Sequence, residues 1–251
     1  MSVTNCKKEA RNCLKTRKLR AARITLSIVF MTVLPGCASY YLPRVFSGIP
    51  YDAYLLAGVQ IALLLLSFAI TGSVRQGRAA WMYCSACGRE PSRLQFVYWL
   101  RRGRGFRAAL LFLNVRLRKA AWKLLLSVPG TAILAAGMLF DDRQNNMIRL
   151  FTLAGGSVCL LTGIVAAAVI NQKYALAPIL LARSPQKGVR SAVRGSCSLT
   201  EEHCMQLFLL DVSFLPWACV CLTLLPIMYV VPYYQQSKAC MLRDILCAHT
   251  I

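Results

Sequence analysis

The stretch AYLLAGVQIALLLLSFAITGSV, residues Ala53–Val74, contains no charged side chain and is the most apolar part of the chain. A helix needs about 20 mostly apolar residues to cross the ~30 Å hydrocarbon core of a bilayer. The stretch is 22 residues long, so it predicts a transmembrane helix.

Four more runs lack charge and are each near the length that a span needs. They are Ile24–Pro43, Leu124–Phe140, Leu150–Gln172 and Val212–Ser237. The chain is 57% hydrophobic and 16% charged, whereas soluble proteins average about 45–50% and about 25%. The predicted fold class is therefore all-α: a polytopic transmembrane helical bundle of about five spans with interfacial helices.

The Lys and Arg residues alternate between crowded and sparse segments. There are 8 before the first run, then 1, 12, 2, 5 and 2 in the segments that follow. If alternate segments lie on the same side, one face of the membrane carries 25 of these residues and the other carries 5. Because basic loops stay in the cytoplasm, we predict that the N-terminus is inside and the C-terminus outside.

This pattern divides the chain into three parts. A basic cytoplasmic segment at residues 1–23 precedes a membrane domain at residues 24–237, and a tail at residues 238–251 follows. Residues 75–123 form the longest hydrophilic segment and are predicted to be a cytoplasmic amphipathic region.

Two short helices are predicted within that region. Gln76–Cys87 should end at Gly88, because glycine readily adopts the left-handed conformation that closes a helix. Arg93–Arg102 interleaves aromatic and basic residues. That mixture suits the headgroup boundary of a membrane, which we favour, or a docking surface for an acidic partner.

The third and fourth runs are predicted to form an antiparallel helical hairpin, because the connection between them is short. Small residues at Gly155, Gly156 and Gly163 should let the helix backbones approach closely. The last run is 26 residues long and contains three prolines. It is therefore either one kinked helix or a broken one. A six-span arrangement, which requires splitting a run or counting Met205–Pro216 separately, is the alternative.

Two sites have candidate chemistry. Asp211 is an acid directly beside a predicted span, so it suggests ion or proton coupling. Its place at the start of the run favours an interfacial role, with headgroups, Ser213 or a helix N-terminus as partners. Cys84 and Cys87 have the spacing of half a zinc site. No second close Cys pair follows, so two incidental cysteines at a helix end are the favoured interpretation.

The sequence contains no catalytic signature. Neither His203 nor His249 stands in a triad or a metal-ligand pattern, and there is no phosphate-binding loop or nucleophile motif. We predict that the protein is not an enzyme and has no catalytic, cofactor-binding or metal-binding residues and no cofactor. The net charge of +21 lies beside the apolar runs. The expected partners are therefore the lipid bilayer, anionic inner-leaflet lipids and other membrane proteins, and not nucleic acid.

The C-terminal third resembles a bacterial integral membrane family, the domain of unknown function 975. Phe208–Trp217, followed by Pro232-Tyr233, is similar to its hallmark, in which a Phe leads into Leu-Ser-Phe-Ile-Gly-Trp and a Pro-Tyr closes the span. The upstream residues of the pattern also fit, and three positions depart from it. The fitting residues are Pro185, Ala192 and Ser196, and the departures are Pro216, Thr200 and Glu202.

The resemblance extends from about Arg75 to the C-terminus and implies a multi-pass protein of the bacterial cytoplasmic membrane. The chain is also distantly similar to the membrane region of some glycerophosphodiester phosphodiesterases, without their catalytic domain. Neither resemblance supplies functional residues. The predicted function is a non-catalytic, envelope-associated scaffold or accessory subunit. The alternative is a transporter of small solutes or lipids with a cavity at the broken last helix.

Overall fold

The structure is a computed structural model that describes residues 2–15, 53–90, 98–99, 104–139, 146–186, 188–221 and 226–248, together with positions 23, 24, 26, 30, 37 and 41. Apart from isolated positions, the predicted span Ile24–Pro43 and the predicted helix Arg93–Arg102 lie outside these residues. Every regular element within the described ranges is helical. The helices are α1 (Val3–Lys15), α3 (Ala53–Ala86), α5 (Arg104–Leu139), α6 (Asn146–Ile170), η1 (Asn171–Tyr174), α7 (Ala177–Arg183), α8 (Val189–Thr200), α9 (Cys204–Ser213), α10 (Leu215–Val220) and α11 (Ile227–Ala248).

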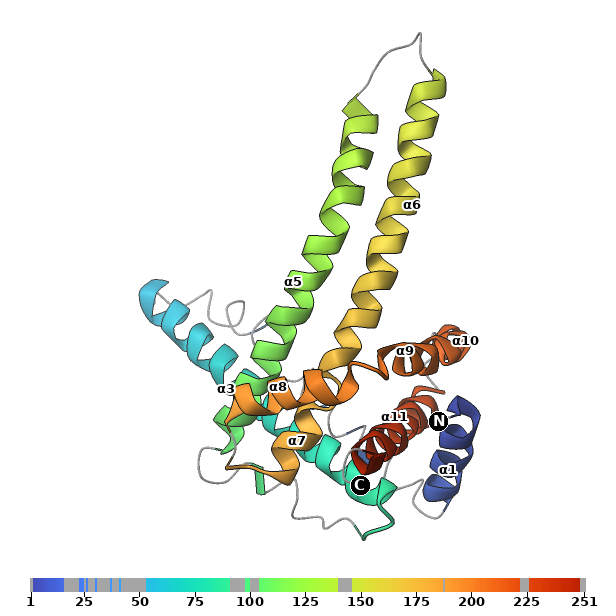
Figure 1. The fold of residues 1–251 in the computed structure, drawn as a ribbon. Coiled ribbons are helices and arrows are strands. Elements are labelled where there is room, and N and C mark those ends of the chain that lie inside the picture. Colours follow the sequence, from blue (N-terminus) through green and yellow to red (C-terminus); the bar gives the residue numbers. More distant parts are fainter. Residues whose placement is uncertain are drawn as a thin grey trace.

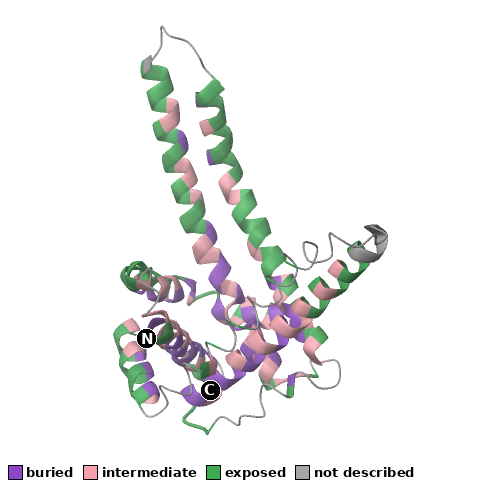
Figure 2. Ribbon diagram, turned by 180° about the vertical axis from the view of Figure 1, so that it is seen from behind, coloured by how far each residue is buried: buried purple, intermediate pink, exposed green. Residues whose placement is uncertain are grey.

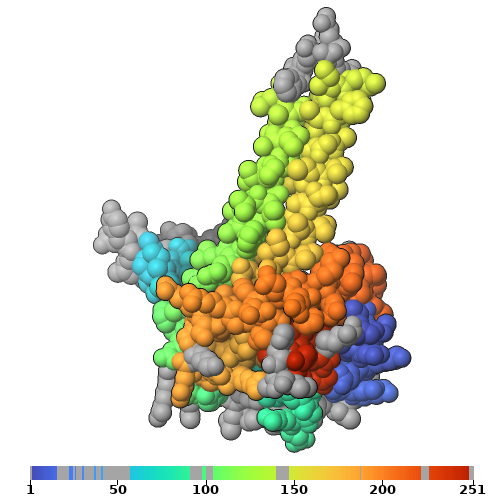
Figure 3. All heavy atoms as spheres, in the orientation of Figure 1, coloured from blue at the N-terminus to red at the C-terminus, as the bar shows by residue number. Residues whose placement is uncertain are grey.

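The helices are arranged as a base from which a long hairpin projects (Figure 1). The hairpin consists of α5 and α6, which run side by side in opposite directions as predicted. The base contains α1, α7, α8, α9, α11 and the C-terminal part of α3. In the space-filling view the hairpin rises well clear of this base (Figure 3).

Glycines hold the two hairpin helices close together. A Cβ added to Gly130 would lie 2.5 Å from the backbone nitrogen of Leu160, and one added to Gly163 would overlap the carbonyl oxygen of Leu126. Gly156 also faces α5, whereas Gly155 faces open space. The predicted close approach is thus confirmed for Gly156 and Gly163, and only such small residues permit it.

The outer faces of the hairpin are apolar and exposed (Figure 2). Leu124 on α5 is 65% exposed, and Phe151 on α6 is 74% exposed. Three described helices are long and apolar enough to cross a membrane: Ala57–Ala86, Arg104–Leu139 and Met147–Arg183. A bent pair, Val189–Thr200 with Cys204–Val220, would make a fourth.

Helix α3 joins two elements that were predicted to be separate. The span Ala53–Val74 and the short helix Gln76–Cys87 form one continuous helix. Gly88 ends it with a φ of 72°, as predicted, and the Arg89 amide donates to the Cys84 carbonyl across this turn. The N-terminal half of α3 is largely exposed, and its C-terminal half enters the base.

The last apolar run does not form one span. It is divided among α9, α10 and α11, and Pro216 lies in the first turn of α10, where its missing N–H costs no hydrogen bond. Helix α11 then continues past the predicted boundary and packs on α1 and α3. Its residues Cys240, Met241 and Ile245 are completely buried. Much of this helix is therefore buried in a protein core and not in lipid.

The two ends of the chain meet in the base. The Arg243 guanidinium of α11 bonds the Glu9 carboxylate of α1 at 2.8 Å and the Ala86 carbonyl of α3 at 2.6 Å. The two ends of the described chain therefore lie side by side in the base. That the N- and C-termini lie on opposite sides of the membrane stays a prediction, and this contact is an argument against it.

Candidate functional site

Four polar residues from three helical elements converge in the base. Asp211 lies on α9, Gln172 on η1, and Tyr234 and Lys238 on α11. Tyr234 and Lys238 are four residues apart, so they share one face of their helix. We call this group the Asp211 cluster.

The Asp211 carboxylate accepts bonds from all three partners. Gln172 Nε2 donates to Oδ2 at 2.7 Å, and the Tyr234 hydroxyl donates to Oδ1 at 2.8 Å. Lys238 Nζ lies 3.2 Å from both oxygens and also donates to Gln172 Oε1 at 3.0 Å. A carboxylate with this many donors is held in one orientation.

The cluster corrects the predicted partners of Asp211. The Ser213 hydroxyl does not reach Asp211; it donates to the Leu210 carbonyl of its own helix at 2.6 Å. Lys238 lies in the segment predicted to be an outer tail, so no sequence pattern pairs it with Asp211. The Tyr234–Lys238 spacing was the one local signal that two polar groups face the same way.

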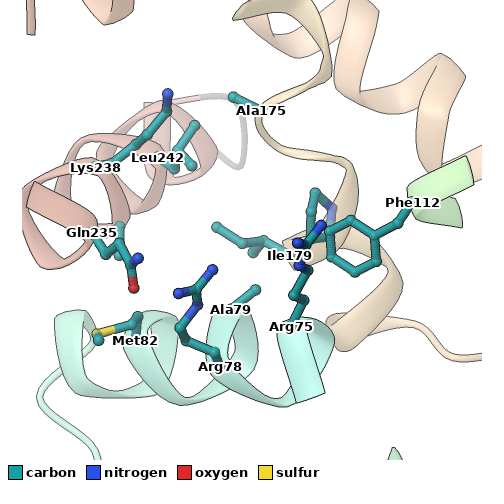
Figure 4. Close-up of a pocket in the computed structure, with 12 residues that line it drawn as sticks. Arg75, Arg78, Ala79, Met82, Phe112, Ala175, Ile179, Gln235, Lys238 and Leu242 are labelled. Carbon is teal, nitrogen blue, oxygen red and sulfur yellow. The ribbon is translucent and has the colours of Figure 1, made fainter. Parts of the chain in front are cut away.

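A cavity of about 190 Å³ adjoins the cluster, between α3, α11 and the start of α7. Arg75 and Arg78 extend from α3 into this space (Figure 4). Its walls are otherwise mainly apolar, with Met82, Phe112 and Ile179 among them. We call this cavity the arginine pocket.

The positive charge of the arginine pocket is unbalanced. The ion pairs within the described residues include neither Arg75 nor Arg78. Arg75 also experiences the positive charge of Arg116 on α5. Lys238 also lines the pocket, but its ammonium group points away from the cavity (Figure 4). That ammonium group bonds Asp211. No lining residue is acidic.

Gln235 of α11 completes the polar lining. Its amide points toward α3, near the Arg78 guanidinium (Figure 4). The Gln235 Oε1 atom is buried, and no partner lies within hydrogen-bond distance. An amide oxygen left without a hydrogen-bond donor in a buried position is costly unless a further group binds there.

The cysteines are distributed over several places. Cys84 and Cys87 line a second cavity, of about 970 Å³, together with Cys247. Within the described ranges, no group of three His, Cys, Asp or Glu residues could hold a metal ion; His249 lies outside these ranges. That the Cys84–Cys87 pair is incidental stays a prediction.

Burial raises the pKa of the Cys240 thiol to about 12, which makes it an unreactive core residue.

The residues that carry the C-terminal resemblance lie where three helices meet. The Phe214 ring, between α9 and α10, packs at 5.3 Å against each of Tyr233 and Tyr234 of α11. The Lys7 ammonium of α1 lies 4.6 Å from the centre of the Phe214 ring. Trp217, by contrast, is 48% exposed. Tyr233 is therefore a packing residue.

Comparisons with known proteins give one match. The model of a family described as "Protein of unknown function (DUF975)" matches residues 1–248, which is more of the chain than the residues that carry the resemblance. No curated protein and no solved structure matches the chain. The distant similarity to glycerophosphodiester phosphodiesterases stays a prediction.

Proposed function

The chain belongs to the family described as Protein of unknown function (DUF975), and we propose that it is a non-catalytic scaffold or accessory subunit of the bacterial cytoplasmic membrane. In this proposal the hairpin of α5 and α6 inserts into the bilayer. The base lies at the cytoplasmic face and holds both termini. Anionic inner-leaflet lipids and other membrane proteins are its partners, and nucleic acid is not.

The charge distribution supports this orientation. If Ile24–Pro43, α3, α5 and α6 each cross the membrane, the chain crosses four times and both termini are cytoplasmic. Of its 30 Lys and Arg residues, 27 then lie inside and 3 outside. This split is sharper than the one given by five spans, and it follows the rule that basic loops stay in the cytoplasm.

The main support for the scaffold role is that no other described helix covers the outer faces of α5 and α6 along most of the hairpin. Within the described chain, α5 and α6 pack on each other through glycines, while their outer faces meet no other helix along most of their length. Such faces are available to lipid and to the spans of another membrane protein. The polar groups that converge in the base, those of the Asp211 cluster, are bonded to one another, which suits a structural role.

Photo-crosslinking in native membranes tests this role. A photoreactive residue at Leu125 or Leu161, which are 64% and 62% exposed, should give protein adducts of one defined mass. The exposed Arg194 on α8 serves as a matched position in the base. Adducts with lipid alone at both hairpin positions would contradict a scaffold role.

Transport is the alternative, and the broken last run favours it, because interrupted helices often line substrate sites. A transporter exposes such a site alternately to the two sides of the membrane. The test places a single Cys at Ser213 in an otherwise cysteine-free chain. If the protein is a scaffold, this Cys should be alkylated from only one side of the membrane. Alkylation from both sides would favour the transporter.

A further inference from the structure

We propose that the arginine pocket binds the phosphate group of an anionic ligand. The sources of that group are an anionic phospholipid at the membrane surface and a soluble phosphate ester. This proposal goes beyond the scaffold role and does not depend on it.

Unbalanced charge is the first reason. Arg75 and Arg78 are three residues apart on α3, so they lie on the same helix face. Both are partly buried, and each experiences the repulsion of a neighbouring arginine. Partly buried charges need a counter-charge, because burial removes the water that would otherwise stabilise them. The only carboxylate of the adjoining Asp211 cluster is already bonded to Lys238.

The chemistry of the lining is the second reason. Each guanidinium presents a planar fork of N–H donors, and two forks match the several oxygens of one phosphate better than the two oxygens of one carboxylate. Arg75 and Arg78 both extend into the same cavity, opposite the Gln235 amide (Figure 4). Because a Gln amide has donors as well as an acceptor, Gln235 can bond a phosphate oxygen or a hydroxyl beside it.

The position of the pocket is the third reason. Arg75 directly follows Val74, the last residue of the apolar stretch, so it lies where that stretch leaves the hydrocarbon. Phospholipid phosphates lie at this level. The apolar walls formed by Met82, Phe112 and Ile179 would accompany the glycerol and upper acyl carbons of a lipid. A soluble phosphate ester would use the arginines and Gln235 alone.

Binding measurements on the full-length protein in detergent distinguish these sources. Native mass spectrometry after addition of phosphatidylglycerol, with phosphatidylcholine as the neutral comparison, reports retained lipid. Thermal unfolding with increasing inorganic phosphate or glycerol 3-phosphate reports the soluble source. Charge-assisted bonds of this kind predict that Arg78→Gln weakens phosphate binding at least about tenfold, and the Arg75→Gln/Arg78→Gln double variant about 100-fold.

Arg194→Gln is the matched control, because it removes the same charge from an exposed position in the base. It should change affinity less than about twofold. The pocket variants should unfold at the wild-type temperature or above it without ligand, because they remove mutual repulsion. They should lose the stabilisation that phosphate or lipid gives the wild type. This ligand-dependent loss separates a binding role from a structural one.

The outcomes are decisive in both directions. Lipid retention or phosphate stabilisation that disappears only in the pocket variants supports the proposal and identifies the source. The proposal is overturned if the wild type responds to neither source. Equal losses in Arg194→Gln and Arg78→Gln would also overturn it, since they would reflect the overall positive charge. Oleate binding as tight as that of phosphatidylglycerol would overturn the assignment to phosphate.

Discussion

Asp211 meets three donors that no local sequence pattern connects to it. Tyr234, Lys238 and Gln172 lie 23, 27 and 39 positions away along the chain. A carboxylate beside an apolar run predicts only that some partner must exist. Gly88, by contrast, was predicted correctly, because the requirement for a left-handed residue at a helix end is local.

The pairing of Asp211 with Lys238 can be measured by a double-mutant cycle. Asp211→Asn leaves the ammonium without its counter-charge, and Lys238→Met leaves the carboxylate without its cation. We expect each to lower the unfolding temperature and the double variant to lose less than their sum. The coupling should be about 0.5–3 kcal/mol, at roughly 2–4 °C per kcal/mol for a chain of this size.

An exposed ion pair provides the comparison for this cycle. Lys173 and Glu201 lie 2.7 Å apart, but both side chains are more exposed than those of Lys238 and Asp211. Glu201→Gln should therefore leave the unfolding temperature nearly unchanged. Strictly additive effects of Asp211→Asn and Lys238→Met would show that the two groups do not interact.

Among the elements, the hairpin was predictable and the last apolar run was not. Two long apolar runs joined by a short connection have one simple arrangement, an antiparallel pair. The run Val212–Ser237 is equally apolar, but composition does not distinguish a lipid-exposed helix from one buried in a protein core. What decides between them is whether other helices cover it. Those helices, α1 and the end of α3, are distant in sequence.

The glycine packing of the hairpin predicts that alanine lowers the free energy of unfolding at Gly163 and raises it slightly at Gly155. In Gly163→Ala the new Cβ meets the Leu126 carbonyl oxygen, so the helices must separate, at a cost of about 1–3 kcal/mol. In Gly155→Ala nothing lies within 4 Å of the new Cβ. Alanine should stabilise the helix slightly there, because it is a better helix former than glycine. Thermal unfolding in detergent measures both.

Equal behaviour of the two variants would contradict the packing described for α5 and α6. A lower unfolding temperature for Gly155→Ala than for Gly163→Ala would contradict it more strongly. It would place the helix contact on the side of α6 that carries Gly155.

At the scale of the whole molecule, the charge pattern and the contacts between helices have to agree. The alternating Lys and Arg counts predict that most basic residues lie on one side of the membrane. They did not determine how many times the chain crosses, because that number depended on whether the last run was counted. The ion pair between Glu9 and Arg243 joins the two ends of the chain in the base, which favours an even number of crossings.

The side on which each end lies is the most direct test of the account. Single cysteines at Ser2, Met147 and the native Cys247 occupy exposed positions in an otherwise cysteine-free chain. A membrane-impermeant maleimide should label Met147→Cys in intact spheroplasts. It should label Ser2→Cys and Cys247 only in inverted membrane vesicles. Labelling of Ser2→Cys and Cys247 from opposite sides of the membrane would contradict the arrangement.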